Sequence, residues 1–181
     1  MQIEKPLAGA RILLRNYEKS DLAFSTDMWL DEENGRYLSD PLRDYIDALY
    51  QNALDTLEDS DTGYYLIIRA RNSDSRIGTL CIFPDESHTT YDIGYCIHKK
   101  YWNKGYATEA VSLAADWIAR QGAQSITAEV AVENTASRAL LEKLGFEIIE
   151  ETAFQKYNMD VCYKSYIYRL ETADAAIKKI G

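Results

Sequence analysis

Hydrophobic and polar residues in the first half of the chain follow patterns that predict strands interrupted by a helical region. Residues 10–17 have the pattern of a strand, and Ser20 is placed to cap a helix over 21–30. A second helix is predicted over 43–57, because apolar residues recur there at helical spacing, namely Tyr45, Ile46, Leu49, Ala53 and Leu57. Together these helices form a predicted flap.

Three strands are predicted after the flap, over 64–70, 77–83 and 90–98, with turn-rich segments between them. Neighbouring antiparallel strands are the simplest arrangement for such runs. After these strands the apolar residues recur at helical spacing. This spacing predicts a helix with one apolar stripe, made of Ala107, Val111, Ala114 and Ile118, and Gly122 is placed to end it.

Alternation returns over 126–132, which predicts a strand with one apolar face. Asn134 is placed to open another helix and Gly145 to end it. Two more strands follow over 146–151 and 161–170, and a short helix is expected in the tail, from residue 171 to 181. This order of elements is not a simple βαβ alternation, so it predicts an α+β (mixed α/β) fold in which helices cover a mixed sheet.

The composition fits one domain over residues 1–181, since 46% of the residues are hydrophobic and 12% aromatic. The 29 acidic and 20 basic side chains give a net charge of −9, which disfavours nonspecific binding to nucleic acid. The charge would suit a basic or polyamine-like ligand, or it merely keeps the protein soluble. Arg69, Arg71 and Arg76 form a small basic cluster without interleaved aromatic residues, so we expect no nucleic-acid partner.

Location and metal binding can be addressed from the apolar runs and the cysteines. The chain begins without a signal-peptide core and has no run of the roughly 20 apolar residues needed to cross a bilayer, which predicts a cytoplasmic protein without a membrane partner. Cys81, Cys96 and Cys162 are widely separated within predicted strands. We therefore expect core cysteines and no metal site.

Residues 91–110 carry the clearest chemical signal. A predicted strand leads directly into Asn103, Lys104 and Gly105 at the start of a helix. A helix N-terminus offers unpaired N–H groups and the positive end of a dipole, so this turn could hold a pyrophosphate. Gly105 and Ala107 would keep bulky side chains away from the anion. The alternative is a turn that only caps the helix.

The chain has an arginine-leading first strand and the segments IGTLCIF, YDIGYCI, YWNKGYATEA and ENTASRALLEKLGF. Through these segments nearly the whole chain resembles the GNAT superfamily of N-acetyltransferases, in the branch like the ribosomal-protein N-terminal acetyltransferases (RimJ/RimL-like). The resemblance implies a mixed, mostly antiparallel sheet of about seven strands with a splayed centre and about four flanking helices. It also implies an acyltransferase that uses acetyl-CoA, with an acceptor-side flap in 1–60, a coenzyme-binding core in 61–146 and final strands and tail in 147–181.

By this resemblance, the family's pyrophosphate loop falls on Trp102, Asn103, Lys104, Gly105, Tyr106 and Ala107, followed by Thr108. Trp102 replaces the Arg or Gln of the wider family, as is common in this branch. Asn103 replaces a Gly, and Asn tolerates positive φ better than most residues, so the loop conformation could be kept.

The resemblance also implies that strand 90–98 splays from strand 126–132 and leaves a cleft for the pantetheine arm. Ile97, His98 and Lys99 are then expected to contact the coenzyme. Asn134 is expected near the pantetheine or thioester, although it could serve only as a helix cap.

Acetylation of an amine requires an uncharged nitrogen, whereas a free alkylamine has a pKa of about 10.4. Asp92 or Glu129 could accept the proton through water, and we favour Asp92, although either carboxylate could instead orient the substrate or face solvent. His98 is a third candidate base.

Many relatives use a tyrosine of the closing helix as general acid, but the matching position here is Leu141. Ser137 matches a serine of the RimJ/RimL-like branch and could donate a hydrogen bond to the thiolate sulfur, or it could satisfy only local backbone.

The implied function is transfer of an acetyl group to a primary amine, either a protein N-terminus or a small amine, by direct attack in a ternary complex. The alternative is a noncatalytic acyl-CoA sensor or regulatory module, which a blocked acceptor cleft would indicate. A homodimer could form through edge strands or the tail.

Overall fold

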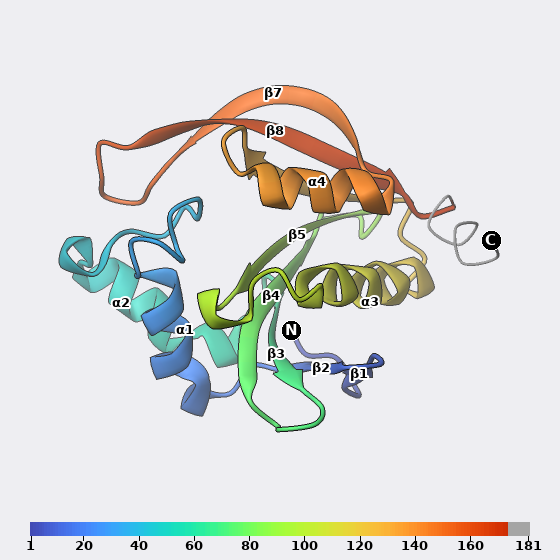
Figure 1. Cartoon of the computed structure of the whole chain (residues 1–181), viewed down its shortest axis with the longest axis horizontal. Coiled ribbons are helices and arrows are strands. Elements are labelled where there is room, and N and C mark those ends of the chain that lie inside the picture. Colours follow the sequence, from blue (N-terminus) through green and yellow to red (C-terminus); the bar gives the residue numbers. More distant parts are fainter. Residues whose placement is uncertain (174–181) are drawn as a thin grey trace.

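The computed structural model describes residues 1–173, in which the strands form one eight-stranded sheet (Figure 1). In spatial order the strands are β1 (Leu7–Ala8), β2 (Ile12–Asn16), β3 (Tyr64–Ala70), β4 (Arg76–Pro84), β5 (Thr90–Ile97), β6 (Ser125–Ala131), β8 (Cys162–Glu171) and β7 (Glu147–Gln155). β5 pairs with β6 in parallel, and the other neighbours pair antiparallel. The predicted mixed, mostly antiparallel sheet is confirmed. The two-residue β1, which the pattern did not indicate, makes eight strands rather than about seven.

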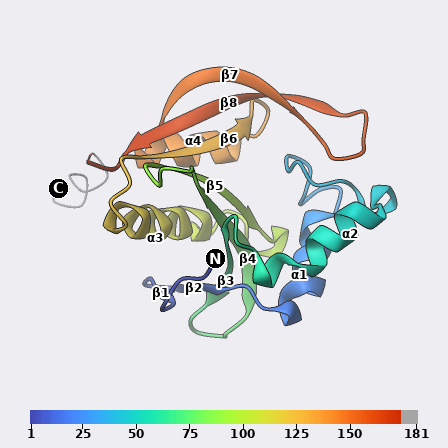
Figure 2. The same cartoon turned by 180° about the vertical axis from the view of Figure 1, so that it is seen from behind.

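The pairing of β5 with β6 stops after three residue pairs, the last of which is Asp92 with Thr127. Beyond this point β5 continues along β4 to Ile97, while β6 continues along β8 to Ala131. Figure 2 shows the two strands diverging. The predicted splay at the centre of the sheet is therefore confirmed.

Helices cover both faces of the sheet. The α-helices are α1 (Leu22–Trp29), α2 (Ala48–Asp55), α3 (Tyr106–Arg120) and α4 (Thr135–Leu144), and the 3-10 turns are η1 (Lys19–Asp21), η2 (Arg43–Tyr45), η3 (Leu57–Asp59) and η4 (Lys99–Tyr101). α3 and α4 lie in front of the sheet in Figure 1. The flap meets the sheet from the other face, where the Trp29 indole donates a hydrogen bond to Thr79 Oγ1 on β4 (2.9 Å).

The main core lies between α3 and the sheet. Three of the four residues of the predicted stripe of α3, Val111, Ala114 and Ile118, have no exposed surface, and neither has Ala110. The fourth, Ala107, is only partly buried. Alternate strand residues face it, including Ile12, Leu14, Leu66, Ile68, Leu80 and Ile82. Each such aliphatic side chain contributes about 1.5–3 kcal/mol when fully buried, so the start of α3 is held firmly against the sheet.

The predicted ends of the two core helices are confirmed. Gly122 (φ +88°) and Gly145 (φ +91°) follow α3 and α4 in the left-handed conformation that glycine adopts without strain. Asn134 caps α4, since its side chain accepts the Ser137 amide (3.2 Å).

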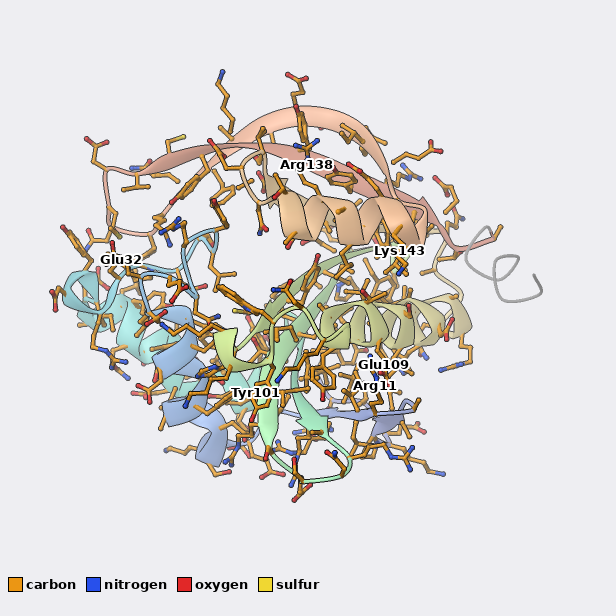
Figure 3. All side chains as sticks on the ribbon, in the orientation of Figure 1. Arg11, Glu32, Tyr101, Glu109, Arg138 and Lys143 are labelled. Carbon is orange, nitrogen blue, oxygen red and sulfur yellow. The ribbon has the colours of Figure 1, made fainter. Side chains whose placement is uncertain are left out.

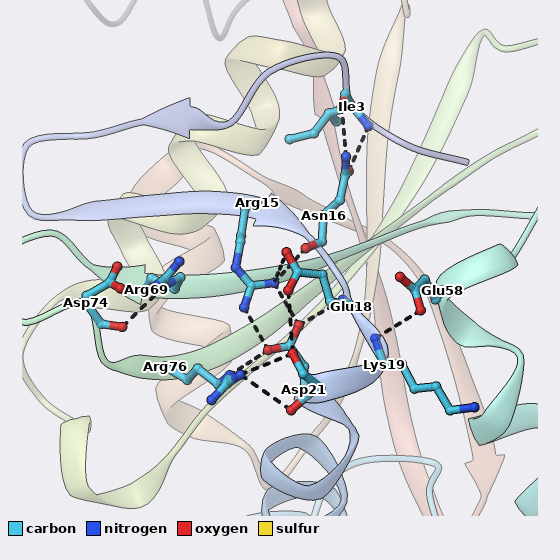
Figure 4. Close-up of polar contacts among 11 residues, drawn as sticks. Ile3, Arg15, Asn16, Glu18, Lys19, Asp21, Glu58, Arg69, Asp74 and Arg76 are labelled. Atoms are coloured by element: carbon cyan, nitrogen blue, oxygen red, sulfur yellow. Dashed lines mark hydrogen bonds and ion pairs between the residues drawn. The ribbon is translucent and has the colours of Figure 1, made fainter.

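A buried carboxylate connects β2 and β4 to the start of the flap. Asp21 is fully buried and accepts two hydrogen bonds from the Arg15 guanidinium (2.7 Å each) and one from Arg76 Nε (2.5 Å), as Figure 4 shows. Its carboxylate also accepts the Glu18 amide. Burial alone would raise the pKa of Asp21, but these hydrogen bonds outweigh that effect and lower it.

The start of α1 differs from the prediction. Ser20 was expected to cap the first helix, but it lies inside η1, and Glu18 and Asp21 form a reciprocal capping box. Position 20 is exposed, whereas Asp21 is bound by two arginines from other strands. The sequence pattern around Ser20 did not reveal those tertiary contacts.

The second flap helix was also predicted wrongly. The segment 43–57 divides into η2 and the shorter α2, because Asp47 caps α2 by accepting the Tyr50 amide (2.8 Å). The buried side chains are consequently Tyr50 and Leu54, whereas Tyr45 (46%) and Leu49 (70%) are exposed.

Three smaller outcomes complete the comparison. Cys96 is buried, as expected of a core cysteine, but Cys162 is exposed on β8. The predicted tail helix falls outside the described residues except for its first three positions. Within residues 1–173, no helix is long and apolar enough to cross a membrane.

We predict that Asp21→Asn lowers the free energy of unfolding by about 3 kcal/mol, because it removes the fully buried anion that pairs with Arg15 and Arg76, which are themselves only partly buried. The pKa of Asp21 is lowered by folding, so its contribution is complete above the pKa of an unfolded aspartate and disappears as the pH falls through the folded value. Denaturant unfolding at neutral and acidic pH measures both effects. The control is Asp74→Asn, which removes the exposed partner of Arg69 and should cost no more than about 1 kcal/mol. Equal losses for the two variants would contradict this account.

Candidate active site

The turn between β5 and α3 has an unusual backbone conformation. Asn103 (φ +57°) and Gly105 (φ +75°) are both left-handed, and α3 begins immediately afterwards at Tyr106. The prediction that Asn103 tolerates positive φ is confirmed. The first hydrogen bond along α3 joins the Glu109 amide to the Gly105 carbonyl (3.2 Å), so the preceding amides at the helix start are left for an external acceptor.

Arg11, the residue directly before β2, holds this turn in place. Its Nη1 donates to the Lys104 carbonyl (2.7 Å) and its Nε to Glu109 Oε2 (2.9 Å). The guanidinium also lies over the ring of Tyr106, 5.0 Å from its centroid. Arg11 and Glu109 face each other beside α3 in Figure 3. The arginine-leading strand therefore fixes the loop that precedes the helix.

A cavity of about 560 Å³, here called the helix-side cavity, opens between this turn, the end of β5 and the start of α4. Its wall includes most of the predicted coenzyme contacts, namely Ile97, Trp102, Asn103, Gly105, Tyr106, Ala107, Thr108 and Asn134, and also the predicted catalytic residue Ser137. The structure thus brings together residues from positions 97–108 and 134–137.

His98, Lys99 and Lys104, which were also predicted to contact the coenzyme, are not on the wall of this cavity. The His98 ring stacks on Phe24 (6.2 Å between centroids), and Lys99 pairs with Asp31 (3.0 Å) and Glu33 (3.1 Å). Lys104 Nζ donates to the Lys100 carbonyl. Burial, followed by the charges of Lys100 and Lys99, lowers the pKa of His98.

A second cavity, of about 460 Å³, lies on the opposite face of the sheet and is here called the flap-side cavity. Asp40, Asp92 and Glu129 line it. Its aromatic wall consists of Trp29, Tyr37, Tyr50, Tyr65, Phe83, Tyr95 and Phe154. Among the described residues, no lysine, arginine or histidine contributes to this wall. Its electrostatic potential therefore favours cations.

The two carboxylates predicted as bases lie together in the flap-side cavity. Asp92 accepts a hydrogen bond from Thr127 Oγ1 (2.8 Å), and Glu129 accepts one from Ser165 Oγ (2.5 Å). Asp92 is reached by water but lies in a concave wall, and this partial desolvation raises its pKa. The hydrogen bond from Thr127 opposes that rise, and the charge of Glu129 adds to it.

Asp40 was missed as a site residue, because the sequence indicated only an Asp-Pro turn. Burial raises the pKa of its carboxyl group, which accepts a hydrogen bond from the Tyr50 hydroxyl (2.5 Å). The loop around it is held by Lys156, a buried residue in the turn of the β7–β8 hairpin. Lys156 Nζ donates to the carbonyls of Gly35 (2.9 Å), Leu38 (2.8 Å) and Asp40 (2.8 Å). No local sequence pattern links Lys156 to this loop.

The two cavities meet where β5 leaves β6. Tyr37, Leu38, Tyr95 and Cys96 line both of them, so a group bound on one side of the sheet can approach a group bound on the other. This shared wall was not predicted in detail, although the splay that creates it was.

Comparison with known proteins decides the family. A family model described as the acetyltransferase (GNAT) domain matches residues 11–147. The chain belongs to the GNAT acetyltransferase family. It is 32% identical over 143 residues to the uncharacterized N-acetyltransferase p20 of Bacillus licheniformis, covering 76% of this chain and 79% of that protein. GNAT proteins are acyltransferases, so the chain is an enzyme of that class.

Solved structures share the fold at low sequence identity. A spermidine N-acetyltransferase from Vibrio cholerae, in complex with CoA and spermine, has a TM-score of 0.78 at 17% identity and covers 93% of this chain and 99% of its own. A RimL ribosomal-protein acetyltransferase in complex with coenzyme A has a TM-score of 0.74 at 15% identity, with coverages of 92% and 98%.

The helix-side cavity fits the acetyl-CoA on which GNAT enzymes act. The left-handed turn and the free amides at the start of α3 suit a pyrophosphate. The edge of β5 beyond Asp92 has no neighbouring strand among residues 1–173 and could pair with the amides of a pantetheine arm. When bound, the coenzyme would supply an activated acetyl thioester.

We predict that Gly105→Glu weakens coenzyme A binding at least about tenfold, or 1.4 kcal/mol, because its carboxylate would stand beside the pyrophosphate. The matched control is Gly122→Glu, since Gly122 is also left-handed and a Cβ there meets nothing within 4 Å. Both variants should lose a similar 1–2 kcal/mol or so of stability to backbone strain. Calorimetric titration with coenzyme A measures the affinities, and equal affinities for the two variants would contradict the placement of the site.

Proposed function

We propose that this enzyme transfers the acetyl group of acetyl-CoA to the primary amine of a small cationic acceptor, by direct attack in a ternary complex. The observation that carries the proposal is the junction of the two cavities across the splayed strands. A donor in the helix-side cavity and an acceptor in the flap-side cavity could meet there without a covalent enzyme intermediate. Holding two reactants in this way is worth about 7–11 kcal/mol in favourable cases.

The chemistry of the flap-side cavity supports a cationic acceptor. Three carboxylates, from Asp40, Asp92 and Glu129, share its wall with several aromatic rings. Aromatic faces and carboxylates both attract ammonium groups. The cavity volume of about 460 Å³ also falls in the range of small-molecule sites.

The cover of the cavity favours a small amine over a protein N-terminus. The turn of the β7–β8 hairpin reaches the flap in both views of the fold (Figures 1 and 2). Lys156 binds three carbonyls of the flap, and the Tyr157 amide donates to the Ser39 carbonyl (2.7 Å). These contacts hold the hairpin against the loop that lines the cavity with Leu38, Ser39 and Asp40, which leaves less room for a folded protein than for a small amine. The solved spermidine N-acetyltransferase with bound spermine offers a precedent for a small cationic ligand on this fold.

We assign Asp92 as the base that accepts the amine proton through water. The neutral nitrogen then attacks the thioester carbon and a C–N bond forms. The C–S bond breaks, its electron pair leaves with sulfur, and the nitrogen, positively charged after the attack, loses its second proton to solvent to give the neutral amide. Glu129 would hold the ammonium form of the acceptor close to Asp92 before the transfer. Solvent takes the proton from Asp92 and supplies one to the departing thiolate.

The alternative of a noncatalytic acyl-CoA sensor is disfavoured by the open flap-side cavity. A sensor was expected to have a blocked acceptor cleft. Here a cavity containing Asp92 and Glu129 adjoins the coenzyme side.

The proposal predicts that diamines and polyamines stimulate thiol release from acetyl-CoA. Their kcat/KM should be at least about tenfold higher than that of peptides that have a free N-terminus and no charged side chains. A thiol-release assay over both panels, at matched ionic strength, measures this preference. Higher activity on the peptides would overturn the small-acceptor assignment, and tight coenzyme binding without turnover of any amine would overturn the enzymatic proposal.

The raised pKa of Asp92 predicts a pH dependence. Its carboxyl group must be ionised to accept a proton, so kcat/KM should fall as the pH drops through a value above that of an ordinary aspartate. Asp92→Asn should remove this limb and lower the rate about 100-fold.

The variant Glu129→Gln distinguishes the role of Glu129 from that of Asp92. Removing the charge of Glu129 should lower the pKa of Asp92, so the acidic limb should move to lower pH while most of kcat remains. A larger loss of kcat in Glu129→Gln than in Asp92→Asn would assign the base to Glu129 instead.

A further inference from the structure

The flap-side cavity has a third carboxylate, Asp40, which the proposed reaction does not use. Asp40 lies on the flap loop between α1 and α2, whereas Asp92 and Glu129 come from strands of the sheet. Its side chain is only partly exposed, and its Oδ1 accepts a hydrogen bond from the Tyr50 hydroxyl (2.5 Å). A carboxylate in such an enclosed position is costly unless a positive charge compensates it.

Lys156 carries a positive charge that acts on Asp40, but it does not form an ion pair with the carboxylate. A lysine has three N–H donors, and those of Lys156 go to the carbonyls of Gly35 (2.9 Å), Leu38 (2.8 Å) and Asp40 (2.8 Å). Burial raises the pKa of Asp40 and outweighs the opposing effects of the Tyr50 hydrogen bond and the Lys156 charge. Within residues 1–173, the carboxylate is therefore fixed on the cavity wall without a cationic partner.

Asp40 and Asp92 lie apart on the wall of the cavity, with Cys81 between them. Asp92 pairs with Phe83 across β4 and β5, and Cys81 pairs with Gly94, about 7 Å further along the strands. Burial raises the pKa of the Cys81 thiol to about 12, and the charges of Asp92 and Asp40 add to that rise. Carboxylates close enough to share one ammonium group would raise each other's pKa, and these two do not. One small molecule with two ammonium groups could span them.

Aromatic side chains surround the Asp40 end of the cavity. Burial, followed by the charge of Asp40, raises the pKa of Tyr50. Burial also raises the pKa of Tyr65 to about 12, with smaller contributions from Cys81 and Asp40. Both tyrosines line the cavity, and aromatic rings attract ammonium groups. This end of the cavity therefore suits an ammonium group better than a neutral one.

We propose that Asp40 binds a second ammonium group of the acceptor, so that the enzyme selects diamines over monoamines. This inference rests on the proposed function, in which Asp92 and Glu129 hold the amine that reacts. The distal nitrogen stays protonated at Asp40, and none of its bonds changes. Asp40 is therefore a specificity-determining residue, which should act on the KM of the acceptor rather than on kcat.

The test compares two acceptors of the same length. One is the linear diaminobutane with an amine at each end, and the other is the aminobutanol in which a hydroxyl replaces one amine. We expect the wild-type kcat/KM to be at least about tenfold higher for the diamine. Asp40→Asn keeps an oxygen that can accept from Tyr50 but removes the charge, so it should lower this ratio about tenfold, mainly through the KM of the diamine.

The matched control is Asp27→Asn. Asp27 is an exposed flap carboxylate that pairs with Arg43 (2.8 Å) and lines neither cavity. Its substitution changes the net charge by the same amount and should leave the ratio of the two acceptors within about twofold. The two acceptors differ in their own pKa values, but this difference cancels when the ratio is compared between variants.

A second measurement does not depend on turnover. Calorimetric titration of each acceptor into the enzyme with bound coenzyme A should show tighter binding of the diamine to the wild type and to Asp27→Asn. Asp40→Asn should lose that preference. Its thermal midpoint should stay the same or rise, because the substitution removes an enclosed charge without an ion-pair partner.

The outcomes separate this inference from the proposed function. If the wild type does not prefer the diamine, or if Asp40→Asn keeps the preference, the role of Asp40 is overturned while amine acetylation stands. If the wild type acetylates no amine, the proposed function fails, and the titrations still decide whether Asp40 binds a second ammonium group. Failure of Asp40→Asn to fold would contradict the premise that its charge lacks a compensating partner.

Discussion

The active-site arrangement depends on one interruption in the sheet, the end of β5–β6 pairing after Asp92 and Thr127. Up to this pair the two strands are held in parallel register, and beyond it each keeps its partner on the outer side. The gap leaves one edge of β5 free and joins the helix-side cavity to the flap-side cavity. Asp92 stands at the last paired position and Tyr95 three residues further on. The interruption therefore places the candidate base close to the wall that the two cavities share.

The two sides of this gap are stabilised by different kinds of contact. On the coenzyme side, the apolar stripe of α3 is buried in the core, and Arg11 ties the preceding turn to Glu109. These contacts can hold the amides at the helix start in place before any ligand binds. On the flap side, the cover depends on polar contacts across the molecule, above all the three hydrogen bonds of Lys156. Burial lowers the pKa of Lys156, and the nearby Asp40 opposes that effect. The flap side is consequently built from long-range contacts. Substitutions that change these contacts could change the acceptor specificity without disturbing the coenzyme side.

The sequence predicted what local patterns determine. The stripe of α3, the glycines that end α3 and α4, the Asn134 cap and the positive φ of Asn103 all follow from backbone preferences within a few residues. The flap was predicted less well, because Asp47 rather than the apolar spacing sets where α2 begins, and because Asp21 is held by arginines from two strands. Lys156 gave no local signal, since its importance comes from the loop that the fold brings to it. Finding it required knowledge of residues far apart in the chain.

The most direct test of the account is a crystal structure with a bisubstrate analogue, in which coenzyme A is joined through an acetyl linker to a diamine. The account predicts a pyrophosphate at the turn around Gly105, a linker in the gap between β5 and β6 beside Tyr95, and an amine in the flap-side cavity within reach of Asp92. An analogue with its amine directed away from the flap-side cavity, or with its linker outside the gap, would contradict the claim that acetyl transfer takes place where the two strands separate.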